Sequence, residues 1–302
     1  MSIVVEEISK EYGIQKALDK VSFTINTGEV VGFLGPNGAG KSTMMKILTG
    51  FIPPSGGAAK ICNLDVEEQS LQVRKAVGYL PEHNPLYLDM YVKEYLHFVA
   101  DIFGLKNKSK RVAEMIELVG ITREQKKKIG ALSKGYRQRV GIAQALIHDP
   151  EVLILDEPTS GLDPNQIIEI RDLIKNIGSS KTVMLSTHIM QEVEAICGRV
   201  IIINKGNIVA DKSTDQIVKT GVKTSVLSVE FSGEIDKNLL LGLAGVRKAK
   251  RIKEGFWAIE HDMDKDIRTS VFNMAVEKNL AVLGMKAEEQ SLEEVFKQLT
   301  KD

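Results

Sequence analysis

The segment from Gly35 to Ser42 restricts the possible folds of this chain more than any other part of the sequence. It reads GPNGAGKS and matches the pattern G-x-x-x-x-G-K-[ST] at every fixed position. The continuous apolar run Val30–Leu34 comes directly before it, and a helical pattern over residues 42–49 follows. Because a buried strand, a glycine-rich loop and a helix occur in this order, the segment is predicted to be a phosphate-binding loop.

The chemistry expected of this loop follows from its residues. Glycines let backbone N–H groups turn inward without Cβ clashes, and these amides form an anion cradle together with the helix N-terminus. The ammonium group of Lys41 is expected to reach the β- and γ-phosphates, and the Ser42 hydroxyl to bind Mg²⁺. The alternative, a glycine-rich turn without a ligand, is disfavoured because motif and context are both present. The predicted nucleotide-binding residues here are Gly35, Asn37, Gly38, Gly40, Lys41, Ser42 and Thr43.

Two adjacent carboxylates follow a second buried strand. The apolar run 152–155 ends at Asp156 and Glu157, and burying two carboxylates without a counter-charge is costly. We therefore expect Asp156 to hold Mg²⁺ through water, and Glu157 to polarise an attacking water as a general base or a positioning group. A helix-capping acid pair at a strand end is the alternative. The phosphate-binding loop upstream favours the catalytic interpretation.

The order of apolar patterns predicts the architecture of the first two thirds of the chain. The first 60 residues are β-rich and predict an antiparallel N-terminal β subdomain. A helical pattern covers about 92–145, which predicts a helical subdomain over about 88–147. Strands at 30–34, 152–155 and 182–186 alternate with helices at 42–49, 165–177 and 191–195. This alternation predicts an α/β fold with a mainly parallel sheet.

The pattern changes after about residue 216. Strands are predicted at 225–231, 246–252, 255–260 and 281–287, and helices at 237–243 and 267–277. The resulting order βαββαβ is that of a small α+β ferredoxin-like domain, and a last short helix is predicted at 292–299. With the break placed near Gly221, the predicted domains are 1–220 and 221–302.

The composition excludes several classes of protein. Forty basic residues balance forty acidic ones, so we expect no nucleic-acid-binding tail. Cys62 and Cys197 are far apart and form neither a metal-spacing pair nor a disulfide framework. The N-terminus lacks the features of a signal peptide, and no apolar stretch reaches the roughly 20 residues needed to span a bilayer. We therefore expect a soluble, cytoplasmic protein.

A third motif lies between the phosphate-binding loop and the carboxylate pair. The segment Leu132-Ser133-Lys134-Gly135-Tyr136, in this order with the other two motifs, resembles the nucleotide-binding subunit of ATP-binding-cassette transporters over residues 2–218. Ser133 and Gly135 match the family signature Leu-Ser-Gly-Gly-Gln, whereas Lys134 and Tyr136 depart from it. The resemblance implies that Ser133 and Gly135 bind ATP held by a second copy. The active form would then be a head-to-tail homodimer.

The resemblance assigns further roles, one residue at a time. Tyr12 matches the aromatic residue that stacks on adenine, although alone it would be read as packing. Glu82 stands where the family has a glutamine that contacts the metal or its water, in a loop that senses the membrane partner. Asp163 matches the loop that links the two sites of the dimer, and His188 matches the histidine that touches the γ-phosphate. The predicted catalytic residues are Lys41, Glu157 and His188, and the predicted metal-binding residues are Ser42, Glu82 and Asp156.

The C-terminal third also resembles part of this family. Exporter-type members carry a small appended α/β domain that ends near a segment like Ser291 to Phe296, and a narrower likeness is to the ATPase subunit associated with bacterial gliding motility. The resemblance implies an ATPase that uses ATP and Mg²⁺ to power export through an integral-membrane permease. It would be cytoplasmic and peripheral on the inner face of the membrane through that partner.

Two alternatives belong to other functional classes. One is a soluble ATPase of the same fold that acts on nucleic acid or ribosomes. The single cassette, the zero net charge and the lack of a long heptad run argue against it. The other is a regulatory module that binds nucleotide without hydrolysing it. The intact Lys41, Asp156, Glu157 and His188 argue against that reading.

Overall fold

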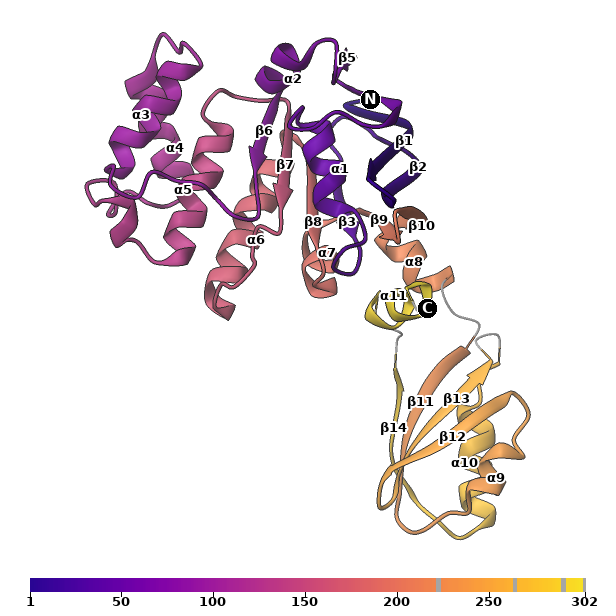
Figure 1. Cartoon of the computed structure of the whole chain (residues 1–302). Helices are drawn as coiled ribbons and strands as arrows, with labels where there is room; N and C mark the ends of the chain where they lie inside the picture. The colour runs from indigo at the N-terminus through magenta and orange to yellow at the C-terminus, as the bar shows by residue number, and fades with distance from the viewer. Residues whose placement is uncertain (221–223, 263–264, 289–291, 301–302) are drawn as a thin grey trace. The chain divides into compact units, whose positions relative to one another are not determined.

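The computed structural model describes residues 1–220, 224–262, 265–288 and 292–300. It divides the chain into two compact units, Met1–Thr214 and Asp215–Asp302 (Figure 1). Gly221, where the domain boundary was predicted, lies outside the described residues, and so does Ser291. The division into domains 1–220 and 221–302 therefore stays a prediction.

A six-stranded sheet forms the centre of the first unit. Its strands are β3 (Val30–Leu34), β6 (Val77–Leu80), β7 (Val152–Asp156), β8 (Thr182–Thr187), β9 (Arg199–Asn204) and β10 (Asn207–Ser213). They lie in the order β10-β9-β3-β8-β7-β6, and all neighbours are parallel except β10 and β9. β7 and β8 are buried along their whole length because their apolar runs are covered on both faces. The predicted α/β fold with a mainly parallel sheet is confirmed.

A second, antiparallel sheet contains the N-terminus. Its strands are β1 (Ile3–Tyr12), β2 (Gln15–Ile25), β4 (Gly56–Ile61) and β5 (Leu64–Asp65), in the order β2-β1-β4-β5. Ile3 and Val5 are buried while the neighbouring Val4 is only partly so, because alternate side chains of a strand point to opposite faces. These inward residues share one hydrophobic core with Phe33 and Met44. The predicted antiparallel N-terminal subdomain is confirmed.

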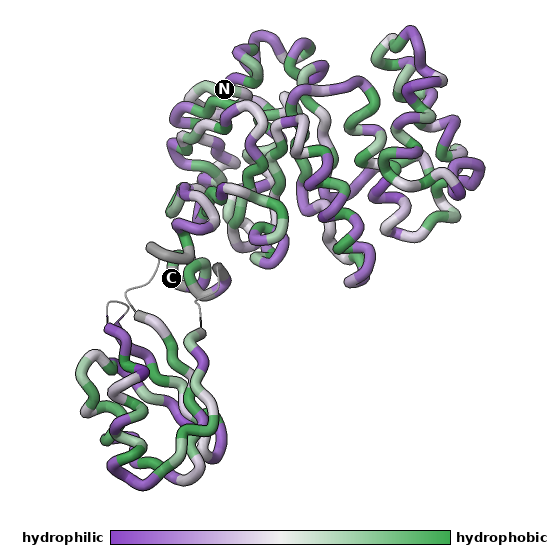
Figure 2. The backbone as a smooth tube through the Cα atoms, turned by 180° about the vertical axis from the view of Figure 1, so that it is seen from behind, coloured by the Kyte–Doolittle hydropathy of each residue, from purple (hydrophilic) through white to green (hydrophobic). Residues whose placement is uncertain are grey.

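The helices of the first unit form two groups. The helices α1 (Lys41–Leu48), α2 (Ser70–Ala76), α6 (Pro164–Gly178) and α7 (Met190–Ile196) connect strands of the two sheets. The helices α3 (Val92–Ile102), α4 (Lys108–Leu118) and α5 (Lys134–Leu146), with the short turn η1 (Ile129–Ala131), lie together beside the β6 edge of the sheet (Figure 1). In Figure 2, green hydrophobic stretches alternate with purple hydrophilic stretches along these helices, as amphipathic packing requires. No described helix has the length and hydrophobicity to cross a membrane.

The second unit contains a four-stranded antiparallel sheet. Its elements are α8 (Thr214–Thr220, which begins at the unit boundary), β11 (Thr224–Phe231), α9 (Lys237–Leu241), β12 (Val246–Lys253), β13 (Phe256–Asp262), α10 (Arg268–Glu277), β14 (Val282–Glu288) and α11 (Leu292–Leu299). The strand order is β12-β13-β11-β14. The buried residues Leu227, Trp257 and Ile259 on the strands pack with Leu240 of α9 and Val271 of α10. This unit therefore has a hydrophobic core of its own.

Candidate active site

The predicted nucleotide-binding residues gather at the carboxyl ends of the parallel strands. A pocket of about 580 Å³ opens there, next to the hairpin between β1 and β2. It is lined by Tyr12, Gln15, Ala17, Asn37, Gly38, Gly40, Lys41, Ser42, Thr43, Glu82, Glu157, Ser160 and His188. The carboxyl edge of a parallel sheet is where α/β folds bind nucleotides. The structure thus brings together residues that are up to 176 positions apart, from Tyr12 to His188.

The backbone of the loop before α1 favours glycine at two positions. Gly38 has φ +80° and Gly40, the N-cap of α1, has φ +109°. A Cβ atom on Gly40 would lie 2.6 Å from the carbonyl oxygen of Ala17. The loop therefore approaches β2 closely and leads directly into the N-terminus of α1, where free amides favour an anion.

Lys41 is nearly buried at the base of this pocket. Its side chain is 7% exposed, its Nζ donates a hydrogen bond of 2.8 Å to the carbonyl of Gly35, and the same Nζ lies 3.7 Å from Oε1 of Glu157. A buried ammonium group between a carbonyl and a carboxylate is held in one place. It can exchange these oxygens for phosphate oxygens with little movement.

The two adjacent carboxylates at the end of β7 are fixed by one residue of β8. Asp156 is 2% exposed, and its Oδ1 accepts a hydrogen bond of 2.5 Å from the Ser186 hydroxyl. The backbone N–H of Glu157 donates to the same hydroxyl oxygen over 3.0 Å. Glu157 has φ +50°, a left-handed conformation that is strained for a residue with a side chain. Strain of this kind persists where surrounding contacts hold a functional residue in place.

His188 follows β8 and points its ring at Glu157. Its Nδ1 lies 2.9 Å from Oε2 of Glu157. A carboxylate only accepts hydrogen bonds, so Nδ1 carries the proton and donates it to this contact. The two oxygens of Glu157 therefore have different partners, Lys41 on one side and His188 on the other.

Oxygen atoms suited to a magnesium ion also lie at this site. Ser42 and Glu82 line the pocket, and Asp156 ends the neighbouring strand. Burial, followed by the negative charges of Asp156 and Glu82, raises the pKa of the Tyr79 hydroxyl well above its ordinary value. Within the described ranges, no group of three or more histidine, cysteine, aspartate or glutamate side chains could hold a metal by itself. This donor set suits an ion that keeps waters and takes phosphate oxygens, as Mg²⁺ does.

Five predicted residues are not among those that line this pocket. Gly35 and Asp156 belong to the phosphate-binding loop and the end of β7, and the other three form a second cluster. Ser133 is the N-cap of α5, and its hydroxyl accepts from the N–H of Tyr136 over 3.4 Å. Asp163 is the N-cap of α6 and accepts from the N–H of Gln166 over 3.0 Å. A Cβ on Gly135 would lie 2.5 Å from the side-chain carbon of Gln166. The starts of α5 and α6 are therefore packed together, and Ser133, Gly135 and Asp163 are not among the residues that line the nucleotide pocket of the same copy.

Three lining residues, Gln15, Ala17 and Ser160, were not among the predicted site residues. Gln15 and Ala17 lie on β2, and Gln15 pairs with Tyr12 across the turn at residues 13 and 14. The glycine at position 13, with φ +58°, was a signal for this hairpin. Recognising the turn would have placed Gln15 beside Tyr12.

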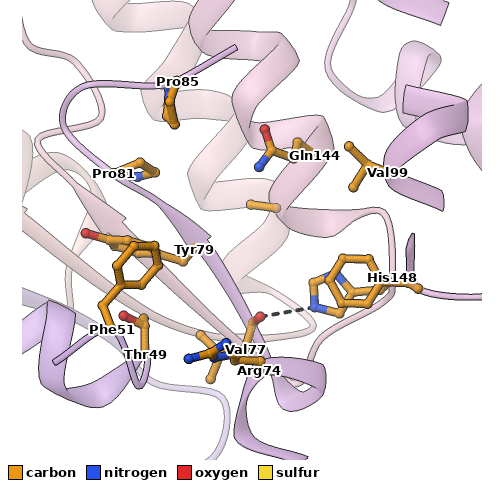
Figure 3. A pocket seen from close by; sticks show the side chains of 12 residues that line it. Thr49, Phe51, Arg74, Val77, Tyr79, Pro81, Pro85, Val99, Gln144 and His148 are labelled. Atoms are coloured by element: carbon orange, nitrogen blue, oxygen red, sulfur yellow. Dashed lines mark hydrogen bonds between the residues drawn. The ribbon is translucent and has the colours of Figure 1, made fainter. Parts of the chain in front are cut away.

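A second pocket, of about 380 Å³, lies between β6 and the helices α3 and α5 (Figure 3). It is lined by Thr49, Phe51, Arg74, Val77, Tyr79, Pro81, Pro85, Val99, Phe103, Gln144, Ala145 and His148. Phe51 is 68% exposed and packs edge-on against Tyr79, with 5.8 Å between ring centroids. Pro81 lines this pocket while the next residue, Glu82, lines the nucleotide pocket. One short segment therefore connects the two pockets.

Comparisons with known proteins agree with this geometry. A model described as ABC transporter matches residues 18–160. The chain is 33% identical to the uncharacterized ABC transporter ATP-binding protein YxlF of Bacillus subtilis, with 97% of each chain covered. It is 32% identical to the bacitracin transport ATP-binding protein BcrA of Bacillus licheniformis, over 99% of this chain and 98% of that one.

The chain belongs to the family of ABC transporter ATP-binding proteins. This ABC ATPase is also 31% identical to the linearmycin resistance ATP-binding protein LnrL of Bacillus subtilis, over 98% of this chain and 97% of that one. Among solved structures, it matches an ATP-binding subunit of an ABC transporter with a TM-score of 0.66 and 30% identity, over 72% of this chain and 92% of that one. It also matches the ATP-binding cassette MJ0796, solved as a post-hydrolysis dimer bound to ADP and Pi, with a TM-score of 0.64 and 26% identity, over 70% of this chain and 98% of that one.

Family membership fixes the general activity. This ABC ATPase binds ATP, and it couples ATP hydrolysis to transport. The comparisons therefore support neither a regulatory module that binds nucleotide without hydrolysing it nor a soluble ATPase that acts on nucleic acid or ribosomes.

Proposed function

We propose that this ABC ATPase works as a head-to-tail homodimer in which each ATP is bound between two copies. The observation that carries the proposal is that Ser133 and Gly135, at the start of α5, are not among the residues that line the nucleotide pocket of their own copy. The start of α5 offers a hydroxyl and free amides to an anion, and Ser133 begins that helix. The solved dimer of a 26% identical cassette supports pairing of two such chains.

Within one copy, each side chain has a separate task. Lys41 binds the β- and γ-phosphates, while the amides from Gly35 to Thr43, including those of Asn37, Gly38 and Gly40, cradle the phosphate chain. Glu157 accepts a proton from the attacking water, and His188 orients Glu157 and contacts the γ-phosphate. Tyr12 stacks on adenine, which its position at the rim of the pocket allows. Asp163 orders the loop between the two sites.

The residues present fit a magnesium ion at this site. Ser42 would bind it directly, Asp156 would hold its water, and Glu82 would add a further oxygen. When bound, the ion neutralises charge that develops on the phosphate oxygens. The Ser186 hydroxyl holds the Asp156 carboxylate in one orientation, which supports this role.

The second pocket is the proposed contact for an integral-membrane permease. Its walls are mostly apolar and include the exposed ring of Phe51, and a concave apolar surface is suited to an apolar segment of a partner. Tyr87 and Phe98, which pack at 5.8 Å and are both exposed, extend this surface beside Pro85 (Figure 3 shows Pro85). The segment from Pro81 to Glu82 would transmit a movement of the permease to the nucleotide-binding pocket.

The direction of transport is proposed to be export. Relatives covered almost end to end are named for bacitracin transport and linearmycin resistance, and another, 33% identical over 74% of each chain, is named a Nod factor export ATP-binding protein. The protein would then be peripheral on the inner face of the membrane through its permease. We propose that the second unit is a ferredoxin-like accessory domain, which its βαββαβ order and strand order support. The narrower likeness to gliding-motility subunits stays a prediction.

The homodimer can be tested with a Glu157→Gln variant in a sizing column. This variant keeps the shape of the site but removes the base, so bound ATP should persist and hold two copies together. We expect a dimer with saturating MgATP and a monomer without nucleotide. The control is Glu157→Gln combined with Lys41→Ala, which should stay monomeric because the phosphates lose their cation. A Glu157→Gln protein that stays monomeric at saturating MgATP would contradict the sandwich.

The membrane partner is tested by purification of the tagged full chain from membranes. A co-purifying integral-membrane protein, lost from a Phe51→Asp variant that still binds ATP, supports the proposed contact. Co-purification of nucleic acid or ribosomes with no membrane protein would support the alternative function.

A further inference from the structure

A fully buried glutamate lies behind the catalytic residues and has no role so far. Glu192, on α7, is 0% exposed. Its Oε1 accepts a hydrogen bond from the Thr159 hydroxyl, and its Oε2 accepts one of 2.7 Å from the Thr187 hydroxyl. Each carboxylate oxygen therefore contacts a different segment, the loop after β7 or the end of β8.

The contact with Thr187 determines how the chain turns at His188. The Thr187 oxygen accepts a hydrogen bond of 3.0 Å from the backbone N–H of Ile189. Since that N–H occupies a lone pair, the hydroxyl proton is free to donate to Glu192. The bond from Ile189 to Thr187 spans His188, and the bond from Thr187 to Glu192 anchors that turn to α7, so the position of the histidine backbone depends on both.

The contact with Thr159 acts in the same way on Glu157. Thr159 is buried and lies two residues after Glu157. The N–H of Ser160 donates to the carbonyl of Glu157 over 3.1 Å, and the N–H of Leu162 donates to the carbonyl of Thr159 over 3.2 Å. Thr159 therefore belongs to two overlapping turns, and the first of them includes the strained backbone of Glu157.

Burying a carboxylate is costly unless its hydrogen bonds are all made with good geometry. An apolar side chain would fill the space under these two turns at lower cost. What it could not do is join them, because it has no acceptor for either hydroxyl, whereas the two oxygens of Glu192 accept one hydrogen bond each. The link between the loop after β7 and the end of β8 therefore explains why a glutamate occupies this buried position.

We propose that Glu192 is a positioning residue that holds Glu157 and His188 in register for hydrolysis. It is fully buried and acts through Thr159 and Thr187. The 2.9 Å contact between His188 and Glu157 spans the two segments that Glu192 joins. This inference rests on the proposed roles of Glu157 and His188.

The test compares Thr187→Val, Thr187→Ser and Glu192→Gln in single-turnover hydrolysis, with the full chain in excess over labelled ATP. Rates are taken per ATP-binding chain, so that a loss of folded protein is removed from the comparison. Thr187→Val should lower the hydrolysis rate about 10- to 100-fold, because misplacement of about 1 Å has effects of that size. Its affinity for ATP should change less than about threefold, since the phosphate-binding loop belongs to other elements. Thr187→Ser, which keeps the hydroxyl, should restore the rate, and Glu192→Gln should fall between the two.

A second comparison separates positioning from general stability. If Glu192 acts through His188, adding Thr187→Val to a His188→Ala protein should cost little further activity. The inference is overturned by a wild-type rate in Thr187→Val, or by the same loss with and without His188. If instead the proposed roles of Glu157 and His188 are wrong, the His188→Ala and Glu157→Gln variants will themselves hydrolyse ATP at the wild-type rate. This result distinguishes failure of the proposed function from failure of the inference about Glu192.

Discussion

His188 donates from Nδ1 to Oε2 of Glu157 over 2.9 Å, and this contact joins the ends of two neighbouring parallel strands. The opposite oxygen of Glu157 lies 3.7 Å from Nζ of Lys41. A carboxylate with a hydrogen bond on one oxygen and an ion pair on the other is restricted in rotation. His188 therefore contributes to the site by orienting Glu157.

Replacing His188 should reduce the rate and leave binding nearly intact. We expect His188→Ala to lower kcat about 10- to 100-fold, within the range by which a positioned acid–base group contributes. KM for ATP should change less, because the phosphate-binding loop is untouched. Steady-state phosphate release measures both constants. His97→Ala, on α3 and outside the nucleotide pocket, is the matched control and should behave as wild type. A large rise in KM with constant kcat would show that His188 binds ground-state ATP instead.

Two tyrosines with different hydroxyl environments, Tyr79 and Tyr95, should respond in opposite ways to replacement by phenylalanine. The Tyr79 hydroxyl is buried and has no hydrogen-bond partner among the described residues, whereas the Tyr95 hydroxyl donates to Gln144 over 2.5 Å. Removing an unsatisfied hydroxyl relieves a desolvation cost, so Tyr79→Phe should raise the free energy of unfolding by about 1 kcal/mol. Tyr95→Phe should lower it by about 1 kcal/mol. Urea unfolding of both variants measures these changes. A change of the same sign in the free energy of unfolding of both variants would contradict the prediction.

His148 makes stability depend on pH in a direction that can be derived. Its Nε2 lies 3.0 Å from the carbonyl of Val77 and must carry the proton, while Nδ1 is buried without a partner in the described part of the chain (Figure 3). Burial lowers the pKa of His148; the bond to Val77 opposes this, and Lys181 and Arg111 reinforce it. The unfolded chain, with a histidine pKa of about 6.5, then binds more protons, so stability is lost as pH falls below about 6.5.

The variant His148→Gln tests this pH dependence. Its amide can still donate to the Val77 carbonyl but does not titrate. Urea unfolding from pH 8 to pH 5 should show a shallower loss of stability than in wild type, by at most about 1.4 kcal/mol per pH unit. Identical slopes for the two proteins would contradict a depressed pKa at His148.

The parts of the fold that could be predicted are those with strong local patterns. Val30–Leu34 and the run 152–155 are buried on both faces and appear in the sequence as continuous apolar runs. β6 (Val77–Leu80) and the short β5 have no such signal, because four or two residues between loops show no period. β9 and β10 were missed as well, although Ile201, Ile202 and Ile203 form an apolar run.

The site residues likewise include some that a local sequence pattern predicts and others that only contacts in the folded chain reveal. The phosphate-binding loop is contiguous, so its residues could be named from spacing alone. Gln15 and Glu192 could not, because their roles depend on contacts between segments distant in the sequence. Ser133 and Gly135 were recognised only through a family resemblance. The single chain shows them only as the capped start of a helix, since they are not among the residues that line its own pocket.

The completion of each site by a second copy is tested most directly by Ser133→Arg in the Glu157→Gln background. Equilibrium sedimentation with saturating MgATP should give the mass of two 33.3 kDa chains for Glu157→Gln. The double variant should remain a monomer, although it binds ATP with an affinity within about threefold of its parent, because its own pocket does not include Ser133. Ser179→Arg, at the exposed far end of α6, should leave dimerisation unchanged. A Ser133→Arg double variant that dimerises as readily as its parent would contradict the account.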